Sequence, residues 1–324
     1  MNKRHLLRSA LGLAALALAG AGHAQDFPPK KAVTLVVGFA PGGAADAAAR
    51  LIAKKLGENI GQSVVVENKA GAGGNIAHQL VANGPADGSM ILLGSIGPLT
   101  IAPHMMKVGY DPFKDLAPLS GGVHFPNVLV VNANSGVKTL ADFVALARKD
   151  PGSVTFASTG PGSASHLTGE LFAQQAKVEM THVPYKGGSA AMPDLLADRF
   201  TAYFAAPPTA LPHIESGKLR PLATTGLARP AYLPNIPTVA ESGYPGFEAL
   251  NWYAFVASAK VPAPVLDRWN QEIVKVLNDA GIREQLQKHG LTPNPTSRAE
   301  LGDFMRKESA KWGAIVRERK ISAE

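Results

Sequence analysis

The sequence predicts an α/β fold made of two αβ domains, each with its own sheet. Short apolar runs rich in β-branched residues alternate with longer stretches whose apolar residues recur at helical spacing. This alternation occurs in two series, and the second begins near Val128. A strand–helix–strand rhythm favours parallel sheets with helices on both faces. With 324 residues and no cysteine, the chain is long enough for one or two cores and has no disulfides.

The first series is predicted to contain three strands and two helices, each strand being short and apolar. In chain order we expect the strand Val33–Phe39, the helix Ala44–Ile60, the strand Ser63–Glu67, a helix opened by Gly71–Gly74, and the strand Met90–Ser95.

The second series alternates strands and helices without interruption, starting with the strand Val128–Asn132. The other expected strands are Val154–Ser158, Thr181–Tyr185, Thr201–Ala205 and Leu219–Thr225. The expected helices are Leu140–Arg148, Ser163–Gln175, Ser189–Ala197 and Thr209–Ser216.

The C-terminal part returns to the first domain. The proline- and glycine-rich segment Ala228–Gly246 is predicted to be a surface connection. It precedes a strand, Leu250–Ser258, and three helices, Pro264–Ala280, Gly281–Gly290 and Ser297–Arg319. The last helix should begin with a capping box and dock its apolar stripe on a domain face. Two connections would therefore cross near 120–130 and 240–255, which divides the chain into residues 25–125 plus 245–324 and residues 126–244.

The first 24 residues have the pattern of an export signal. Three basic residues in the first eight positions precede the apolar run Leu11–Ala19, and small residues lead up to Ala24. The apolar run is shorter than the roughly 20 residues that a transmembrane helix needs. We therefore expect cleavage after Ala24 and a soluble mature protein in the periplasm, with no membrane insertion.

The charge of the chain does not indicate a nucleic-acid partner. The sequence has 32 Lys+Arg and 25 Asp+Glu, and without the three basic residues of the predicted signal the balance is +4. No block of like charges stands out, so nucleic acid is not expected. The histidines are scattered without metal-ligand spacing, and cysteine is absent. We expect neither a metal nor a cofactor.

Several predicted strands end in Gly, Ser or Thr directly before a helix. In an open α/β sheet, ligands bind at the carboxyl ends of strands, where helix N-termini offer unpaired N–H groups and a positive dipole end. The residues of any one such loop are explained by turns and helix caps alone. The presence of these loops in both series, however, favours a cleft in which both domains bind an anion. The loops are Ala40–Gly43, Ser95–Gly97, Ser158–Ser163, Lys186–Ser189 and Ala205–Pro208.

Three side chains in these loops have two interpretations each. Asp46 lies in the first turn of a helix, where it either complements the dipole or contacts a ligand amine, hydroxyl or bridging water. Ser163 is a candidate N-cap that needs no ligand. His166 points either toward the same cleft or into the packing of its own helix.

Enzyme signatures are weak. The stretch "GPGSAS" approximates G-x-G-x-x-G, with Glu179 about 20 residues further on, but the third glycine is a serine and a proline interrupts the loop. The motifs G-x-S-x-G, H-E-x-x-H and G-x-x-x-x-G-K-[ST] are absent from the sequence. Because Ser163 and His166 share one helical turn, they are poorly placed as nucleophile and base. We expect no catalytic residues, and an enzyme using Ser163 or Asp46 is the less favoured alternative.

Ordered motifs along nearly the whole mature chain resemble the receptors of tripartite tricarboxylate transporters, the Bug family. They include "TLVVGFAPGGAADAAARLIAKKL", "GQSVVVENKAGAGGNIA", "FASTGPGSASHLTGELF", "HVPYKGG" and "IPTVAESGYPGFEALNWYAFVA". The resemblance implies a type II periplasmic-binding-protein-like fold, with two αβ domains, a ligand cleft and two crossover hinges. It also implies ligands that are small carboxylates: di- and tricarboxylic acids, acidic amino acids or aromatic acids.

The resemblance further implies which residues bind the ligand. The strand-end loop at Ser95 adds one candidate from the sequence pattern itself. Many family members carry an acidic residue where this chain has Ala205-Ala206; its absence disfavours a ligand amine and favours a bulkier or aromatic carboxylate. The candidates are Phe39, Ala40, Gly42, Gly43, Asp46, Ser95, Ser158, Thr159, Gly160, Ser163, His166, Tyr185, Ala205 and Ala206.

These patterns predict a monomeric periplasmic receptor that closes over a carboxylate and then docks on a membrane permease of the tripartite type. A ligand drives closure only if it binds the closed state better. A receptor that senses its ligand for a signalling partner is the alternative that the sequence leaves open.

Overall fold

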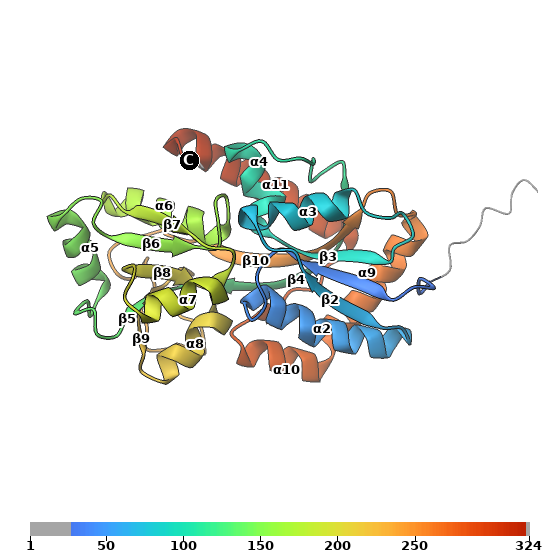
Figure 1. Ribbon diagram of the computed structural model, residues 1–324, viewed down its shortest axis with the longest axis horizontal. Helices are drawn as coiled ribbons and strands as arrows, with labels where there is room; N and C mark the ends of the chain where they lie inside the picture. The colour runs from blue at the N-terminus through green and yellow to red at the C-terminus, as the bar shows by residue number, and fades with distance from the viewer. Residues whose placement is uncertain (1–26, 322–324) are drawn as a thin grey trace, which may run out of the picture.

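The computed structural model describes residues 27–321 and contains two lobes, each built on one sheet (Figure 1). The predicted signal lies outside the described residues. Among the described residues, no helix has both the length and the apolar character needed to cross a membrane. The predicted α/β class is confirmed by this arrangement.

The first lobe has a six-stranded sheet of order β11-β4-β10-β3-β1-β2. Its strands are β1 (Val33–Val37), β2 (Val64–Asn68), β3 (Met90–Ser95), β4 (Leu116–Pro126), β10 (Leu250–Ser258) and β11 (Thr292–Pro293). Its helices are α2 (Ala44–Ile60), η1 (Ala72–Gly74), α3 (Asn75–Ala82), η2 (Gly97–Ile101), α4 (Ala102–Met105), α9 (Ala263–Asn278), α10 (Ala280–Lys288) and α11 (Arg298–Arg319).

Alternating side chains of this sheet fill two separate apolar clusters. Leu35 and Val37 of β1 pack with α2, α9 and α10, whereas Val36 packs with α3 and α11 on the other face. The last helix begins with the expected capping box of Ser297 and Glu300. Its predicted stripe is mostly buried, so the expected docking on a lobe is confirmed; buried members of the stripe are Leu301, Met305, Trp312 and Val316.

The second lobe has a five-stranded sheet of order β7-β6-β8-β5-β9. Its strands are β5 (Val128–Asn132), β6 (Thr155–Ser158), β7 (Thr181–Pro184), β8 (Ala202–Ala205) and β9 (Leu219–Thr224). Its helices are α5 (Leu140–Lys149), α6 (Ala164–Ala176), α7 (Gly188–Leu196) and α8 (Pro207–Glu215).

Neither sheet is wholly parallel, which corrects the prediction of parallel sheets. The strands β1, β2 and β3 pair in parallel, but β10 is antiparallel to both β3 and β4. In the second sheet, β5 is antiparallel to β8 and β9. The reason is the path of the chain: β4 runs toward the second lobe and β10 runs back from it, so the two strands have opposite directions.

The chain crosses between the sheets twice, and the crossings are hydrogen-bonded to each other. Only Asn127 separates β4 from β5, and residues 225–249 separate β9 from β10. The Asn127 amide donates to the Thr225 hydroxyl (2.8 Å), and the Thr225 amide donates to the Asn127 carbonyl (3.0 Å). Ala249 in turn donates to the Thr225 carbonyl (2.9 Å). These bonds hold both crossings beside the space between the lobes.

Candidate functional site

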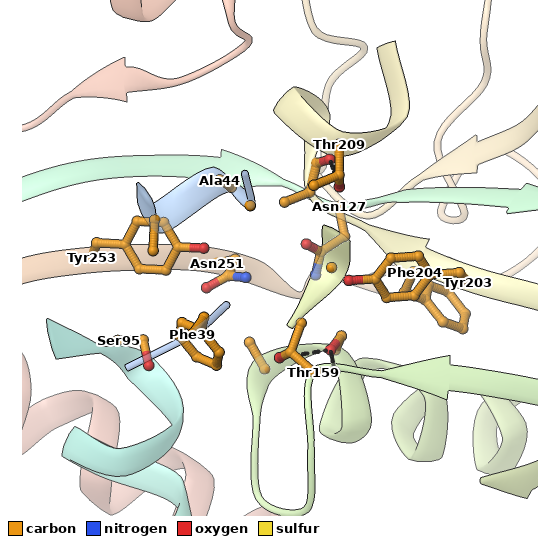
Figure 2. A pocket seen from close by; sticks show the side chains of 16 residues that line it. Phe39, Ala44, Ser95, Asn127, Thr159, Tyr203, Phe204, Thr209, Asn251 and Tyr253 are labelled. Atoms are coloured by element: carbon orange, nitrogen blue, oxygen red, sulfur yellow. Dashed lines mark hydrogen bonds between the residues drawn. The ribbon is translucent and has the colours of Figure 1, made fainter. Parts of the chain in front are cut away.

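A pocket lies between the two lobes, beside the crossings (Figure 2). The space open to the centre of a water molecule inside it is about 30 Å³, whereas one water needs roughly 10–15 Å³ in this measure. The pocket is therefore small in this state of the protein and suits a compact ligand. Its lining comes from three places: the first lobe, the second lobe and the crossing strands.

Aromatic side chains form much of the pocket wall, and none of the lining residues within 27–321 is charged. Figure 2 shows Tyr253 on one side and Tyr203 on the other, with both hydroxyls directed toward the centre. Phe39 and Phe204 complete the aromatic lining. Burial raises the pKa of both tyrosines above the usual value of 10. Both therefore stay neutral, so any charge on a ligand must be met by backbone dipoles.

Four helices direct their N-termini at this pocket. Lining residues lie at or next to the starts of α2, α6, α7 and α8. The start of α2 is the most open: its N-cap is Gly43, which provides no side-chain cap. The N–H groups of Ala44 and Ala45, both at the pocket wall, therefore form the positive end of the helix dipole and have no side-chain oxygen capping them. An anion is the ligand that such a helix start favours.

Two of the other three helix starts are less open to an anion. Ser163 caps α6 and accepts the His166 amide at 3.4 Å. The helix α8 begins with Pro207 and Pro208, which have no N–H group. Gly187 before α7 offers no side-chain cap, so α2 and α7 are the two uncapped helix starts at the pocket.

Asp46 is buried behind the first loop and does not line the pocket. Its carboxylate accepts the Gly42 amide (2.9 Å), the Asn68 amide group (3.0 Å) and the Arg50 guanidinium (2.9 Å). Burial by itself raises the pKa of Asp46, but the Arg50, Gly42 and Asn68 hydrogen bonds and the Arg50 charge outweigh it and lower the pKa below 3.8. Asp46 thus anchors the loop, and Arg50 balances its charge.

The lobes touch each other at the mouth of the cleft. The Ala40 amide donates to the Lys186 carbonyl (3.1 Å). The Ser189 hydroxyl donates to the Pro41 carbonyl (2.7 Å). Because Ala40 and Pro41 belong to the first lobe and Lys186 and Ser189 to the second, the structure has the cleft closed on this side.

Two glycines allow a second contact between the lobes. A Cβ on Gly73, whose φ is +63°, would collide with the Pro161 carbonyl oxygen. A Cβ on Gly97 would lie only 2.7 Å from the Gly162 carbonyl oxygen. Only glycine lets the backbones approach this closely. We call the contact of these four residues the seam.

Two histidines of the second lobe, His166 and His182, form a cluster behind the seam rather than in the pocket. His166 and His182 stack with ring centroids 3.9 Å apart. The Gly162 amide donates to His166 Nδ1 (3.2 Å), and Ser158 bonds to His182 Nε2 (2.5 Å). Burial and then the charge of His166 lower the pKa of His182 to about 3. The cluster therefore supports the loop that forms the seam.

Five of the predicted site residues line the pocket: Phe39, Gly43, Ser95, Thr159 and Ala206. The others lie behind the loops or at the seam. Tyr185 donates to Asp194 at 2.8 Å, away from the pocket. The predicted residues outside the pocket lining are Ala40, Gly42, Asp46, Ser158, Gly160, Ser163, His166, Tyr185 and Ala205.

Sequence reasoning missed the polar residues on the crossings. Asn127 and Asn251 line the pocket, and the Oδ1 atom of each is buried without a hydrogen-bond partner. Ser95 Oγ is in the same state. Asn127 and Asn251 lie on the predicted hinges, near 120–130 and 240–255. That position could have indicated them as site residues, because hinge residues border the cleft. Other lining residues that were not predicted include Tyr203, Tyr253 and Thr209.

Ser95 is held in place from its backbone. Its N–H donates to His78 Nε2 (3.3 Å), and His78 Nδ1 bonds to the Gly74 carbonyl (2.9 Å). Burial lowers the pKa of His78 to about 4. The ring is therefore neutral at pH 7, so Nδ1–H donates to Gly74 and Nε2 accepts from Ser95. The Ser95 hydroxyl takes part in none of these bonds.

Comparison with known proteins identifies the family. The sequence model described as tripartite tricarboxylate transporter family receptor matches residues 48–321. The chain belongs to this receptor family. The protein BugT of Bordetella pertussis is 35% identical over 295 residues, which cover 90% of this chain and 90% of BugT.

Solved structures agree with this assignment. The periplasmic binding protein BugD is 31% identical, with a TM-score of 0.87 over 91% of this chain and 99% of BugD. A protein of R. palustris solved with adipate is 34% identical, with a TM-score of 0.88 over 92% of this chain and 99% of that protein. The receptor therefore has the two-lobed periplasmic-binding fold that its sequence predicted.

Proposed function

We propose that this receptor binds a small carboxylate in the periplasm, either a di- or tricarboxylate or an aromatic carboxylate, and delivers it to a permease of the tripartite tricarboxylate type. The observation that carries the proposal is the uncapped start of α2 at the wall of a closed, uncharged pocket between the lobes. A helix start of this kind stabilises an anion without a cationic side chain.

The two crossings would act as hinges. In this proposal the domains are residues 25–125 plus 245–324 and residues 126–244, and the protein is a monomer whose signal is removed after Ala24. The open form takes up the acid at α2, and the second lobe then closes over it to form the seam. The closed form is the one that a permease would recognise, because only there are both lobes in fixed relation.

Binding without catalysis is supported by the placement of the reactive side chains. Ser163 caps its own helix and Asp46 is paired with Arg50, and neither lines the pocket. The pocket itself offers hydroxyls and amides but no carboxylate or imidazole that could act as a general base. An enzyme acting at this pocket would need a nucleophile and a base that both face the ligand.

Calorimetric titration tests the proposal. We expect saturable binding of at least one acid from a panel of succinate, citrate, benzoate and nicotinate, and mass spectrometry should recover that acid unchanged after incubation. If no carboxylate binds, the proposal fails. If the acid is converted to a product, the protein is an enzyme and not only a receptor. Uptake by cells that carry the cognate permease, with and without the receptor, separates transport from sensing.

A further inference from the structure

The pocket contains buried polar atoms that no group of the described chain satisfies. Seven buried side-chain atoms in residues 27–321 lack a hydrogen-bond partner, and three of them, in Ser95, Asn127 and Asn251, belong to pocket-lining residues. Leaving such atoms unpaired is unfavourable. Because three of them belong to residues that line one small pocket, they indicate that the ligand supplies the missing hydrogen bonds.

The neighbours of Asn127 favour one orientation of its amide. Its Nδ2 group donates to Thr168 Oγ1 (3.4 Å), and the Thr168 hydroxyl donates to the Ala164 carbonyl (2.8 Å). If the amide were turned over, the Thr168 hydroxyl would have to give up its bond to Ala164 in order to donate to Asn127 Oδ1. The unpaired atom of Asn127 is therefore an acceptor, and the group that satisfies it must be a donor.

A second carboxylate would fit this region poorly. A carboxylate only accepts hydrogen bonds, so it cannot satisfy Asn127 Oδ1. No Lys, Arg or His side chain lines the pocket to balance a second negative charge, and burying an unpaired charge is costly. No Asp or Glu lines the pocket either, so a ligand ammonium also lacks a partner.

We infer that the preferred ligand is a singly charged acid that carries a neutral hydrogen-bond donor, such as a hydroxyl, a carboxamide or a ring N–H, which donates to Asn127 Oδ1. This inference rests on the proposed function, because it places the carboxylate at α2. Ser95 and Asn251 also line the pocket and carry buried oxygens without a partner. Asn127 is thus a specificity-determining residue.

Matched pairs of acids test the inference in the unaltered receptor. Calorimetry compares lactate with propionate and 3-hydroxybenzoate with benzoate, and adds succinate and adipate as dicarboxylates. We expect the hydroxylated member of at least one pair to bind about tenfold or more tightly than its partner, and more tightly than either dicarboxylate. Equal binding within both pairs, or tighter binding of a dicarboxylate, overturns the inference while leaving carboxylate binding intact.

Two variants show whether Asn127 is responsible. Asn127→Leu removes the acceptor, and Thr168→Val removes the hydroxyl that holds the amide in its orientation without touching the pocket lining. Both should shrink the difference between hydroxylated and plain acids, whereas a merely structural effect would weaken both acids equally. Thr181→Val is the control, because Thr181 lies on β7 and its hydroxyl donates to the Gly152 carbonyl, away from the pocket lining; it should change the binding of neither acid.

The outcomes separate the two proposals. If no acid of either kind binds the unaltered receptor, the proposed function fails and the inference fails with it. If acids bind but the preference for the hydroxylated member persists in full in Asn127→Leu and Thr168→Val, the donor is recognised elsewhere and the inference alone is wrong.

Discussion

The loop before α2 and the loop before α6 both join a parallel strand to a helix, but they leave their helices in different states. The first ends in Gly43, which gives α2 no side-chain cap. The second ends in Ser163, whose hydroxyl caps α6. The first loop is anchored from behind by Asp46 and the second by His166.

The difference in capping indicates that the two loops have different functions, one in anion binding and the other in the contact between the lobes. An uncapped helix start keeps its N–H groups available and suits an anion, whereas a capped start is satisfied within the protein. The glycines of the second loop serve the contact between the lobes, where Gly162 meets Gly97. The first loop thus carries the open helix start and the second forms the seam, although Ala40 and Pro41 of the first loop also contact the second lobe and Thr159 of the second loop lines the pocket. The following substitutions test that division.

Gly43→Asp should have the largest effect. Gly43 has φ −84° and ψ 176°, and a Cβ there has no neighbour closer than 3.5 Å, so aspartate fits the backbone. Its carboxylate would cap α2 and repel a ligand anion. We expect affinity for the bound acid to fall at least about 100-fold, the equivalent of roughly 2.7 kcal/mol, while thermal stability is kept. Gly43→Ser is the uncharged control and should lose less affinity; an unchanged affinity in Gly43→Asp would rule out this site.

Gly97→Ala should have the next largest effect, because it obstructs the seam. The added methyl group would lie 2.7 Å from the Gly162 carbonyl oxygen. We expect about tenfold weaker ligand binding, since closure contributes to the observed affinity. The same substitution at Gly302 on α11, where the added Cβ would meet only the flexible end of Arg306 at 3.3 Å and Pro118 at 3.7 Å, controls for loss of a glycine. If Gly97→Ala binds as tightly as the unaltered receptor, the seam has no part in closure.

Ser163→Ala should affect stability rather than binding. The substitution removes the cap of α6, and such losses cost about 0.5–2 kcal/mol in the free energy of unfolding. Urea denaturation measures that cost, and calorimetry should find ligand affinity within about twofold of the original. A large loss of affinity with unchanged stability would mean that Ser163 contacts the ligand.

Acid should destabilise the protein through His182, with the smallest effect of the four. The folded pKa of about 3 lies below the unfolded value of 6.5, so the unfolded state binds more protons between these pH values. Stability should therefore fall as pH falls from 6.5 toward 3. Urea denaturation of His182→Gln at pH 7.5 and pH 5 should show a smaller difference than the original protein. An equal difference would assign the pH dependence to other groups, among which His78 also has a lowered pKa.

Much of the fold could be predicted from the sequence because local patterns and tertiary structure agree. The helix α2 runs from Ala44 to Ile60 as the periodicity indicated, and β3, β5 and β10 have the predicted bounds. The strand β4 was missed because Pro118, Gly121 and Gly122 interrupt its apolar pattern and resemble a turn.

The candidate site could be predicted only in part. Glycine-rich loops are visible in a sequence, but whether they face a ligand or the opposite lobe depends on how the lobes meet. Tyr203 and Tyr253 lie on buried strands whose composition indicates core. Asn127 gains its significance from the Thr168 hydroxyl, 41 positions away, and no local pattern contains that relation.

A crystal structure with a bound acid, chosen by calorimetry, tests the central claim most directly. We predict that the ligand carboxylate accepts hydrogen bonds from the N–H groups at the start of α2, at Ala44 and Ala45, with the seam closed. A carboxylate bound instead by the loop before α6, or outside the pocket between the lobes, would contradict the assignment of binding to the first loop and closure to the second.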